Sequence, residues 1–519
     1  MIKKIKNVVL IIRDGWGINS NPYYNAVAQA KTPNIDAFLK KYPYSVLDAS
    51  GLAVGLPEGY QGSSEVGHLN MGAGRIVEQE LKRINNEIKK GILFQHPNFQ
   101  KVIKNCLKNK KALHIMGLVQ DEGVHSHQDH LFTIIKYAKE QGISDCWIHF
   151  FTDGRDTSPK SALIFLEILN NKIKEHKIGK IATVMGRYYA MDRSRNWKLT
   201  NRAYEAITKA KGIKSNNTEN AIKKAYKMKG VNKELITDEY IPPSVIGNYK
   251  GVKKGDSVIF FNYRQDRAIQ LTKFFIEDNC PERKKKIEVV FCGLTRYYDS
   301  FPYYILEPMD ESKGMKNLLG EIISKNNLWQ LRIAETQKFR HVTSFFNGKL
   351  IKPFNKEVRI EIKSSYDAAD FAQHPEMNIF DVTEEVIKQI DSEKYSLIVL
   401  NFANCDMVGH TGDFKAAKKS VEVVDECVEK VVKKVLEKEG IALVTADHGN
   451  VEQMIDYKTR LTKTSHTTNP VEFIYIAKDY KKKRLRKKGI LSDIAPTILY
   501  LLKIKIPKEI TAKNLITKS

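Results

Sequence analysis

The chain has 519 residues, of which 42% are hydrophobic and 28% are charged, an ordinary globular composition that excludes disordered and collagen-like proteins. At about 150 residues per domain, this length allows three domains or two large ones. Lysine and arginine exceed aspartate and glutamate by 85 − 60 = 25, so nucleic acid, a membrane surface or a small anion must be considered as a partner.

Targeting signals and structural cysteines are not evident. A membrane-spanning helix needs about 20 consecutive apolar residues, and every apolar run here is far shorter. The N-terminus is basic, but the apolar run after it stops at Arg13 and Asp14 without a small-residue cleavage site, so we expect a cytoplasmic protein. The six cysteines form no Cys-x-x-Cys pair, which favours buried free thiols over a zinc ribbon or disulfides.

Short β-rich runs alternate with longer helical patterns along the chain. In chain order, strands are predicted at 7–12, 44–49, 112–117, 146–151, 181–185, 257–262, 287–291, 396–402, 441–445 and 471–476. Helices are predicted at 415–439 and at 492–502, among others, the latter with Pro496 in its first turn. The alternation favours βαβ units with parallel sheets, and therefore an α/β fold.

The residues that follow the predicted strands are of two kinds. Runs near both ends of the chain end in acid, whereas runs in the middle lead into arginine-rich loops. Ligands bind beyond the carboxyl ends of strands in open α/β sheets, so we predict one acidic and one basic ligand-binding edge. The simplest topology is a discontinuous metal-binding domain of residues 1–77 and 312–519, with a substrate-binding domain of residues 78–311 inserted into it.

Three carboxylates and three imidazoles form the predicted acidic edge: Asp14, Asp406, His410, Asp447, His448 and His466. Taken singly, each has an ordinary structural explanation such as a helix cap, and only their conjunction points to a site. Mixed oxygen and nitrogen ligands suit Mn²⁺ or Zn²⁺ better than Ca²⁺. Six ligands are too many for one tetrahedral zinc, but they suit two metal ions about 3.5–4 Å apart that clamp a phosphoryl displacement.

A nucleophile is predicted in the glycine-rich stretch Gly62-Ser63-Ser64-Glu65-Val66-Gly67-His68. This is not a Gly-x-Ser-x-Gly elbow, because valine occupies the place of the second glycine. A serine beside two metal ions needs no histidine base, since coordination lowers the pKa of its hydroxyl. Spacing alone does not choose between the two serines, and a glycine loop with capping serines explains the stretch equally well.

The predicted basic edge has five arginines on successive loops: Arg155, Arg187, Arg193, Arg264 and Arg267. Arginine is preferred where a planar oxyanion is held by paired hydrogen bonds, so a small ligand with a phosphate and a carboxylate fits the set. Asp153 and Asp156 interleave with the arginines, which a groove for a nucleic-acid backbone would not favour. Asp156 either binds substrate hydroxyls or pairs an arginine. P-loop and dinucleotide-binding motifs are absent.

Several motifs extend these sets. The acidic edge contains Asp14-Gly-Trp-Gly, Gly-Ser-Ser64-Glu-Val-Gly-His, Asp406-Met-Val-Gly-His410, Thr-Ala-Asp447-His448-Gly-Asn and Ser-His466-Thr. The middle contains His125-Ser-His, Asp-Gly-Arg155-Asp156-Thr, Gly-Arg187-Tyr-Tyr-Ala-Met-Asp-Arg193 and Asn-Tyr-Arg264-Gln-Asp-Arg267, and Lys338 lies in Ala-Glu-Thr-Gln-Lys-Phe-Arg-His. Together they resemble the motifs of the cofactor-independent phosphoglycerate mutase family, part of the alkaline phosphatase superfamily, in the family's order.

The resemblance implies an alkaline-phosphatase-like mixed-sheet domain with an inserted α/β domain, and an activity. The family interconverts 3-phosphoglycerate and 2-phosphoglycerate without 2,3-bisphosphoglycerate, typically as a monomer with two Mn²⁺ ions; Zn²⁺ and Co²⁺ are alternatives. Ser64 takes the place of the nucleophile that forms a phosphoserine. One metal ion would be held by Asp14, Ser64, Asp447 and His448. The other would be held by Asp406, His410 and His466.

The resemblance also implies substrate-contacting residues, namely His125, Arg155, Asp156, Arg187, Arg193, Arg264, Arg267 and Lys338. Lys338 would in addition neutralise charge that develops during phosphoryl transfer. The chain departs from the family pattern at Ser63, Arg340 and Lys349 and over residues 364–377. These departures concern loop geometry and leave the expected metal ligands untouched.

Two alternatives remain. A metal-dependent phosphomonoesterase or a sugar-phosphate mutase of the same superfamily would share the acidic edge, but the arginine-rich insert argues against both. A basic nucleic-acid-binding protein would need a clustered basic face with interleaved aromatic residues, whereas the lysines are dispersed along the chain. We therefore expect 2- and 3-phosphoglycerate as small-molecule partners, without nucleic acid or membrane.

Overall fold

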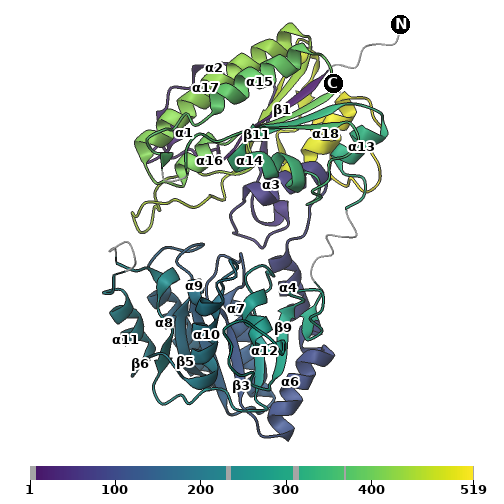
Figure 1. The fold of residues 1–519 in the computed structure, drawn as a ribbon. Helices are drawn as coiled ribbons and strands as arrows, with labels where there is room; N and C mark the ends of the chain where they lie inside the picture. The colour runs from purple at the N-terminus through teal and green to yellow at the C-terminus, as the bar shows by residue number, and fades with distance from the viewer. Residues whose placement is uncertain (1–6, 230–234, 308–314, 368–369, 518–519) are drawn as a thin grey trace. The chain divides into compact units, whose positions relative to one another are not determined.

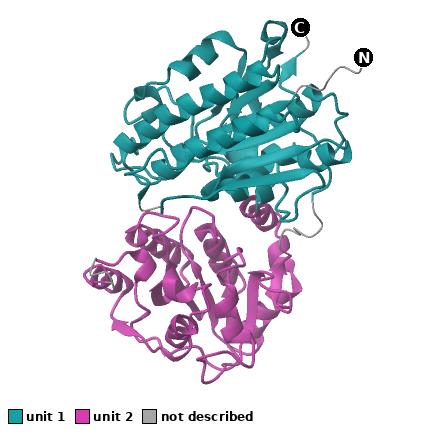
Figure 2. Ribbon diagram, turned by 45° about the horizontal axis from the view of Figure 1, so that its top comes forward, with its two compact units in different colours: residues 1–79, 310–519 teal, residues 80–309 magenta. Residues whose placement is uncertain are grey.

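The computed structural model describes residues 7–229, 235–307, 315–367 and 370–517 (Figure 1). The chain divides into two compact units, residues 1–79 with 310–519 as unit 1 and residues 80–309 as unit 2 (Figure 2). The first domain boundary, expected at 77/78, thus lies at 79/80. The second, expected at 311/312, falls outside the described residues. Within the described ranges, no helix has the length and apolar character needed to span a membrane.

Unit 1 is built on an eight-stranded sheet with the order β12-β11-β13-β1-β14-β15-β2-β17. Its strands are β1 (Val8–Arg13), β2 (Tyr44–Asp48), β11 (Gln330–Glu335), β12 (Glu357–Ile362), β13 (Leu397–Phe402), β14 (Ile441–Thr445), β15 (Val471–Ile476) and β17 (Lys488–Ile490). β15 runs antiparallel to both of its neighbours, and the other pairings are parallel. The carboxyl ends of β11, β13, β1 and β14 therefore meet at one edge of the sheet.

Helices cover both faces of this sheet (Figure 1). They are α1 (Ala26–Gln29), α2 (Pro33–Lys41), α3 (Ser64–Ala73), α13 (Leu319–Lys325), α14 (Thr336–Arg340), α15 (Ile379–Asp391), α16 (Asn404–Gly409), α17 (Phe414–Glu437) and α18 (Ile494–Leu501), with the short helices η1 (Gly51–Val54), η4 (His341–Phe345), η6 (Tyr480–Lys482) and η7 (Leu491–Asp493). α17 packs against α1, α2, α15 and α16, and it buries a stripe of valines. A small second sheet pairs β16 (Arg484–Leu485) with β18 (Ile516–Thr517).

Unit 2 has its own eight-stranded sheet, with the order β10-β9-β8-β3-β4-β5-β7-β6. The strands are β3 (Leu113–Leu118), β4 (Cys146–Thr152), β5 (Lys180–Gly186), β6 (Ile213–Ser215), β7 (Ser244–Ile246), β8 (Ser257–Phe260), β9 (Val290–Thr295) and β10 (Tyr304–Leu306). Only the pairing of β5 with β7 is antiparallel among these described strands. Its helices are α4 (Glu80–Lys89), α5 (Ile92–Gln95), α6 (Pro97–Lys108), α7 (Gln128–Glu140), α8 (Ala162–His176), α9 (Arg187–Ala190), α10 (Trp197–Lys209), α11 (Thr218–Ala225), α12 (Ile269–Ile276) and η2 (Asp238–Tyr240).

The predicted α/β class and mixed-sheet domain are confirmed, and all ten predicted strands coincide with strands of the two sheets. The largest displacement is at 287–291, because β9 begins only at Val290. β11 was not predicted, although it lies inside the sheet of unit 1. The predicted free thiols are confirmed: all six cysteines are free, and Cys280 alone is half-buried rather than buried.

Candidate functional site

The three predicted strand-end acids come together because their strands are neighbours. β1 pairs with β13 on one side and with β14 on the other. Asp14 directly follows β1, Asp406 lies in α16 just after β13, and Asp447 follows β14. The backbone N–H of Asp406 donates to the carbonyl of Asp14 at 3.0 Å, so these two loops are joined directly. All three carboxylates are buried at the same sheet edge.

Ser63 and Ser64 have different positions and contacts at the start of α3. Ser63 is the N-cap of α3, and its hydroxyl accepts a hydrogen bond from the backbone N–H of Val66 at 3.4 Å. Ser64 is the first helical residue, is buried, and donates its hydroxyl to Asp14 Oδ1 at 3.0 Å. Its Oγ also lies 2.9 Å from His448 Nε2. Of the two serines, Ser64 alone therefore lies in the acidic cluster.

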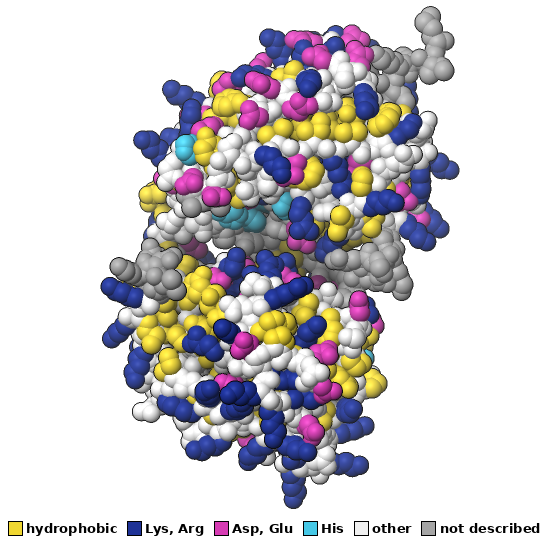
Figure 3. Space-filling model, viewed as in Figure 1, with side chains coloured by type: hydrophobic (Ala, Val, Ile, Leu, Met, Phe, Trp, Pro, Cys, Tyr) yellow, Lys and Arg dark blue, Asp and Glu magenta, His cyan; other side chains and the backbone are white. Residues whose placement is uncertain are grey.

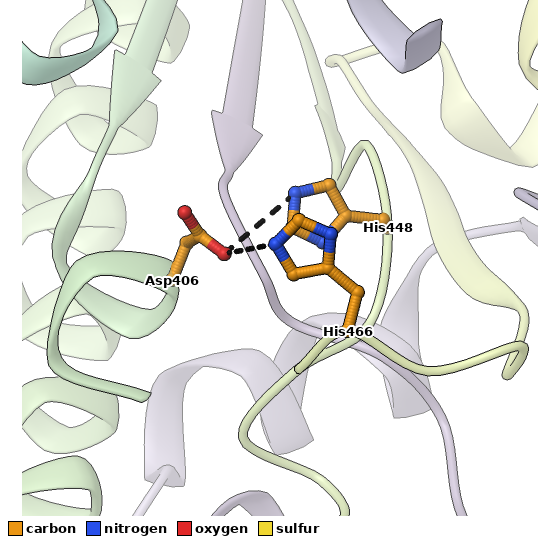
Figure 4. A group of neighbouring side chains, drawn as sticks. All are labelled: Asp406, His448 and His466. Carbon is orange, nitrogen blue, oxygen red and sulfur yellow. Dashed lines mark ion pairs between the residues drawn. The ribbon is translucent and has the colours of Figure 1, made fainter. Parts of the chain in front are cut away.

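Two groups of side chains have ligand atoms close enough to share a cation. Asp14, Asp447 and His448 form one, Asp406, His448 and His466 the other, and the ligand atoms within each lie within 4.8 Å of one another. Figure 4 shows the second group, in which Asp406 Oδ1 lies 3.0 Å from His466 Nε2 and 3.8 Å from His448 Nε2. The rings of His448 and His466 stack, with centroids 3.9 Å apart. His448 thus belongs to both groups.

His410 joins the second group with an orientation that suits a ligand. Its Nδ1 lies 2.7 Å from the carbonyl of Thr464, and Nδ1 of His466 lies 2.9 Å from the carbonyl of Gly62. A carbonyl oxygen only accepts, so in both rings Nδ1 carries a proton, and each ring in its neutral form presents the lone pair of Nε2. The two Nε2 atoms are 3.1 Å apart, and His410 Nε2 is 3.3 Å from Asp406 Oδ1. Two such lone pairs facing one acid suit a bound cation.

Lys338 lies in the same cluster, on α14. Its buried Nζ contacts Asp14 Oδ1 at 2.7 Å, Asp406 Oδ2 at 2.6 Å and Ser64 Oγ at 2.6 Å. Burial alone would lower the pKa of Lys338, but the carboxylates of Asp14 and Asp406 raise it above its usual value. Burial would likewise raise the pKa values of Asp14 and Asp406, and Lys338 holds both well below the usual range.

Sequence reasoning missed two buried residues that connect the expected ligands. Asn401, in β13, donates to Asp14 Oδ2 at 2.7 Å, and its amide nitrogen lies 3.1 Å from His68 Nε2. His68 Nδ1 lies 2.9 Å from the carbonyl of Ser64 and 3.2 Å from Asp447 Oδ2. His68 stands one helical turn after Ser64, a spacing that places it on the same face and could have identified it. Asn401 carries no such signal.

The residues of the acidic cluster fit divalent metal ions. The donor set combines carboxylate oxygens with imidazole nitrogens, which suits Mn²⁺, Co²⁺ or Zn²⁺. Asp447 Oδ2 is buried and accepts no hydrogen bond from the described residues, although His68 Nδ1 lies 3.2 Å away, so this oxygen can take a further ligand. All the expected metal ligands lie in unit 1.

The basic edge is assembled within unit 2. Arg187 is buried and donates to Asp153 Oδ1 at 2.6 Å and to Asp156 Oδ2 at 2.5 Å. Arg193 donates to Asp266 Oδ2 at 2.6 Å, and Arg264 lies 3.2 Å from Asp266 Oδ1. Asp153 and Asp266 were not among the predicted site residues, yet both hold arginines of the edge. Asp156 pairs an arginine, one of its two expected alternatives.

His125 lies at the centre of these arginines. Burial lowers its pKa to about 2, and the positive charges of Arg187, Arg264, Arg267 and Arg193 add to the effect. The imidazole is therefore neutral at physiological pH. Arg155 differs from the others, because it pairs with Glu239 Oε1 at 3.1 Å and is half exposed. Of the eight predicted substrate-contacting residues, Lys338 is the one that lies in unit 1 instead.

Comparisons of this chain with known proteins all indicate the same family. The model of the metalloenzyme superfamily matches residues 6–506. The chain is 47% identical over 516 residues to a 2,3-bisphosphoglycerate-independent phosphoglycerate mutase of Clostridium tetani, covering 98% of this chain and 99% of that one. It is 46% identical over 522 residues to the protein of the same name from Acetivibrio thermocellus, covering 99% and 100%. A crystal structure of Leishmania mexicana phosphoglycerate mutase at low cobalt concentration superposes with a TM-score of 0.76 at 29% identity, covering 100% and 99%.

Proposed function

The chain belongs to the 2,3-bisphosphoglycerate-independent phosphoglycerate mutases of the metalloenzyme superfamily, and on that premise we propose that it interconverts 3-phosphoglycerate and 2-phosphoglycerate through a phosphoserine at Ser64. One observation carries the choice of nucleophile. The buried Ser64 Oγ is within 3.0 Å of Asp14, His448 and Lys338 together. No comparable contacts surround Ser63 in the described structure, where its hydroxyl caps α3.

Two divalent metal ions are part of the proposal, with Mn²⁺ as the preferred ion and Co²⁺ or Zn²⁺ as alternatives. Asp14, Ser64, Asp447 and His448 would hold one, and Asp406, His410 and His466 the other. When bound, such ions lower the pKa of a serine hydroxyl and neutralise phosphoryl oxygens. The Leishmania relative was crystallised at low cobalt concentration, which is compatible with this choice of metals. The reaction needs no 2,3-bisphosphoglycerate, because Ser64 itself carries the phosphoryl group between the two positions.

Lys338 has a role that follows from its contacts. Its ammonium donates to Ser64 Oγ and bridges Asp14 and Asp406. A buried cation at the nucleophile stabilises negative charge on Oγ and on the phosphoryl oxygens that approach it. We assign Lys338 as a catalytic residue that also contacts the phosphoryl group of the substrate.

The arginine edge of unit 2 is proposed to bind the substrate. His125, Arg155, Asp156, Arg187, Arg193, Arg264 and Arg267 would contact it, with paired guanidinium hydrogen bonds to its carboxylate and its phosphate oxygens. Asp153 and Asp266 orient Arg187 and Arg193 for this task. After the first transfer, glycerate must stay bound while its other hydroxyl reaches the phosphoserine. A carboxylate that remains held by arginines meets this requirement.

We further propose a cytoplasmic monomer whose partners are the two phosphoglycerates, without nucleic acid. Figure 3 supports the last point, because lysine and arginine side chains on the visible face are interspersed with acidic and hydrophobic ones. Non-specific nucleic-acid binding would favour a continuous basic stripe.

The decisive experiment is an assay of the chelator-treated protein with 3-phosphoglycerate and no 2,3-bisphosphoglycerate. Adding Mn²⁺ should produce 2-phosphoglycerate, and Ser64→Ala should lower turnover by at least about 10³-fold, since it removes the nucleophile. Ser63→Ala is the matched control and should keep most of the activity. Mass spectrometry of acid-quenched enzyme should find phosphate on the peptide that contains Ser64.

The other outcomes separate the alternatives. Release of inorganic phosphate in place of 2-phosphoglycerate would identify a phosphomonoesterase. Turnover of pentose phosphates in place of phosphoglycerate would identify a sugar-phosphate mutase. Full activity of Ser64→Ala would reject Ser64 as the nucleophile and direct attention to Ser63.

A further inference from the structure

We propose that Glu452 is a positioning residue that holds three ligand-bearing loops of unit 1 in the arrangement that metal binding requires. The inference rests on the proposed two-metal site and adds a residue that does not belong to the expected ligand set. Glu452 follows His448 by four residues. Its side chain is fully buried, and its carboxylate accepts hydrogen bonds from the backbone of the surrounding loops.

The Glu452 carboxylate accepts four hydrogen bonds. Oε2 accepts from the backbone N–H of Gly17 at 3.1 Å and of Asn450 at 2.7 Å. Oε1 accepts from Asn469 Nδ2 at 2.9 Å and from the hydroxyl of Thr467. The Thr467 hydroxyl accepts from the backbone N–H of Asn469 at 3.2 Å, so its own proton is directed to Glu452. Every acceptor site of a deprotonated carboxylate thus meets a donor.

Each donor lies close in sequence to an expected metal ligand. Gly17 follows Asp14 by three residues, Asn450 follows His448 by two, and Thr467 directly follows His466. One carboxylate therefore ties together the loops that carry ligands of both proposed metal ions. A backbone that carries a ligand can move only as far as its hydrogen bonds allow, so Glu452 limits the movement of all three loops.

The network also reaches the remaining ligand loop. Asn450, whose backbone N–H is held by Glu452, donates its side-chain amide to Asp406 Oδ1 at 3.1 Å. Two glycines leave the space that the carboxylate fills. A Cβ on Gly17 would lie 2.5 Å from Glu452 Cδ, and a Cβ on Gly449 would lie 2.3 Å from its Oε1. The loops are thus shaped around this side chain.

The four donors also show what a substitution at Glu452 would disturb. Each is an N–H or O–H group directed at an acceptor oxygen of the carboxylate. The isostere glutamine would place an NH₂ group against two of these donors and would lose hydrogen bonds that join the loops.

The test is a titration of chelator-treated protein with Mn²⁺, followed by the electron paramagnetic resonance signal of the free ion. Wild type should bind two Mn²⁺ ions. Glu452→Gln should bind them about 10–100-fold more weakly, the usual cost of losing a partner behind the ligands. The free energy of unfolding in chelator is measured alongside, so that loss of affinity can be compared with loss of stability.

A matched control is available in the same unit. Asp425 in α17 is also a buried carboxylate, and it accepts from the backbone N–H of Asn34 at 3.2 Å and of Ile35 at 2.7 Å, at the start of α2. Asp425→Asn should lower stability while leaving both Mn²⁺ affinities at the wild-type value. Thr467→Val is a milder second variant that removes one donor to Glu452, and it should weaken Mn²⁺ binding by several-fold even if Glu452→Gln does not fold.

The outcomes distinguish this inference from the proposed function. If wild type binds no Mn²⁺, the two-metal site itself is rejected. If wild type binds two ions and both Glu452→Gln and Thr467→Val bind them equally well, the positioning role of Glu452 alone is rejected. A loss of affinity in Asp425→Asn equal to that in Glu452→Gln would also reject it, because it would reduce the effect to general stability.

Discussion

Histidines of this chain are held in two opposite electrostatic surroundings. Burial alone would lower the pKa of His448, but the carboxylates of Asp447, Asp14 and Asp406 raise it to about 10. In unit 2, burial lowers the pKa of His130 to about 3, with no carboxylate among the causes of the shift. The same side chain is therefore kept protonated among carboxylates in one unit, with a charge that a bound metal ion would replace, and kept neutral inside the other.

This difference predicts that unit 2 loses stability in mild acid. His130 is buried in α7, and its Nε2 lies 2.8 Å from Asn85 Oδ1. Its pKa is about 3 in the folded state against about 6.5 unfolded, so the unfolded chain binds the extra proton first. The stabilising contribution is complete above pH about 6.5 and is lost as the pH falls toward 3. Between pH 6.5 and 5 this one group should cost about 2 kcal/mol.

The measurement is urea unfolding in chelator at pH 7 and pH 5. Other groups titrate as well, so the comparison is with His130→Gln, which has no proton to gain. The variant should lose about 2 kcal/mol less than wild type between the two pH values. An equal loss in both proteins would show that His130 does not carry this pH dependence.

At the scale of elements, the contact between α3 and η4 places Ser64, the proposed nucleophile, beside Lys338. η4 continues from α14, which carries Lys338, and α3 begins at Ser64. The two helices touch at Gly72, where an added Cβ would lie 1.8 Å from the carbonyl oxygen of Phe346. The absence of a side chain at this position thus sets how closely the segments that carry Ser64 and Lys338 approach.

The substitution Gly72→Ala tests that contact, because the contact reverses the sign of the expected change in the free energy of unfolding. Inside a helix, alanine ordinarily stabilises by about 0.8–1 kcal/mol relative to glycine. Here it should destabilise by about 1–3 kcal/mol, because backbone must move to relieve the overlap. Turnover should fall by about 10-fold or more, since Ser64 and Lys338 are moved apart. Urea unfolding and the mutase assay check both values, and a stabilised, fully active variant would contradict the close approach.

Strand-end acids could be predicted from the sequence because each closely follows a short apolar run. β1, β13 and β14 each begin with at least four consecutive apolar residues, are buried along their whole length and lead into an acid within a few residues. β11 could not be predicted, because Gln330 and Arg332 interrupt its pattern although both are fully buried. Their polar groups find partners only in the folded strand: Gln330 donates to the carbonyl of Gly320, and Arg332 donates to Gln330 Oε1 at 2.7 Å and stacks over Phe346.

The same limit applies within the site. Ligand types and spacing predicted Asp406 with His410 and Asp447 with His448, since these pairs are local. Spacing left Ser63 and Ser64 open, and the start of α3 distinguishes them because one serine caps the helix and the other lies inside it. Glu452 and Asn401 reach the ligand-bearing segments mainly through residues distant in sequence, such as Gly17 and Asp14, so these contacts could not be predicted without the structure.

At the scale of the whole molecule, the two units have separate sheets and separate hydrophobic cores. The expected metal ligands all belong to unit 1, so bound metal should stabilise that unit selectively. A ligand that binds only the folded state adds RT ln(1 + [L]/Kd), about 2.7 kcal/mol for each site at 100 times Kd.

Hydrogen exchange with mass spectrometry can follow each unit separately. Adding Mn²⁺ to chelator-treated protein should slow exchange in β1, β13 and β14 by up to about 100-fold for each occupied site at that concentration, while β3, β4 and β8 of unit 2 exchange at an unchanged rate. Asp406→Asn removes one expected ligand and should lose most of the protection, which controls for non-specific ion effects. Equal slowing in both units would contradict the expectation that the metal ions bind unit 1 alone. Ions bound only to unit 1 should protect only the core of unit 1.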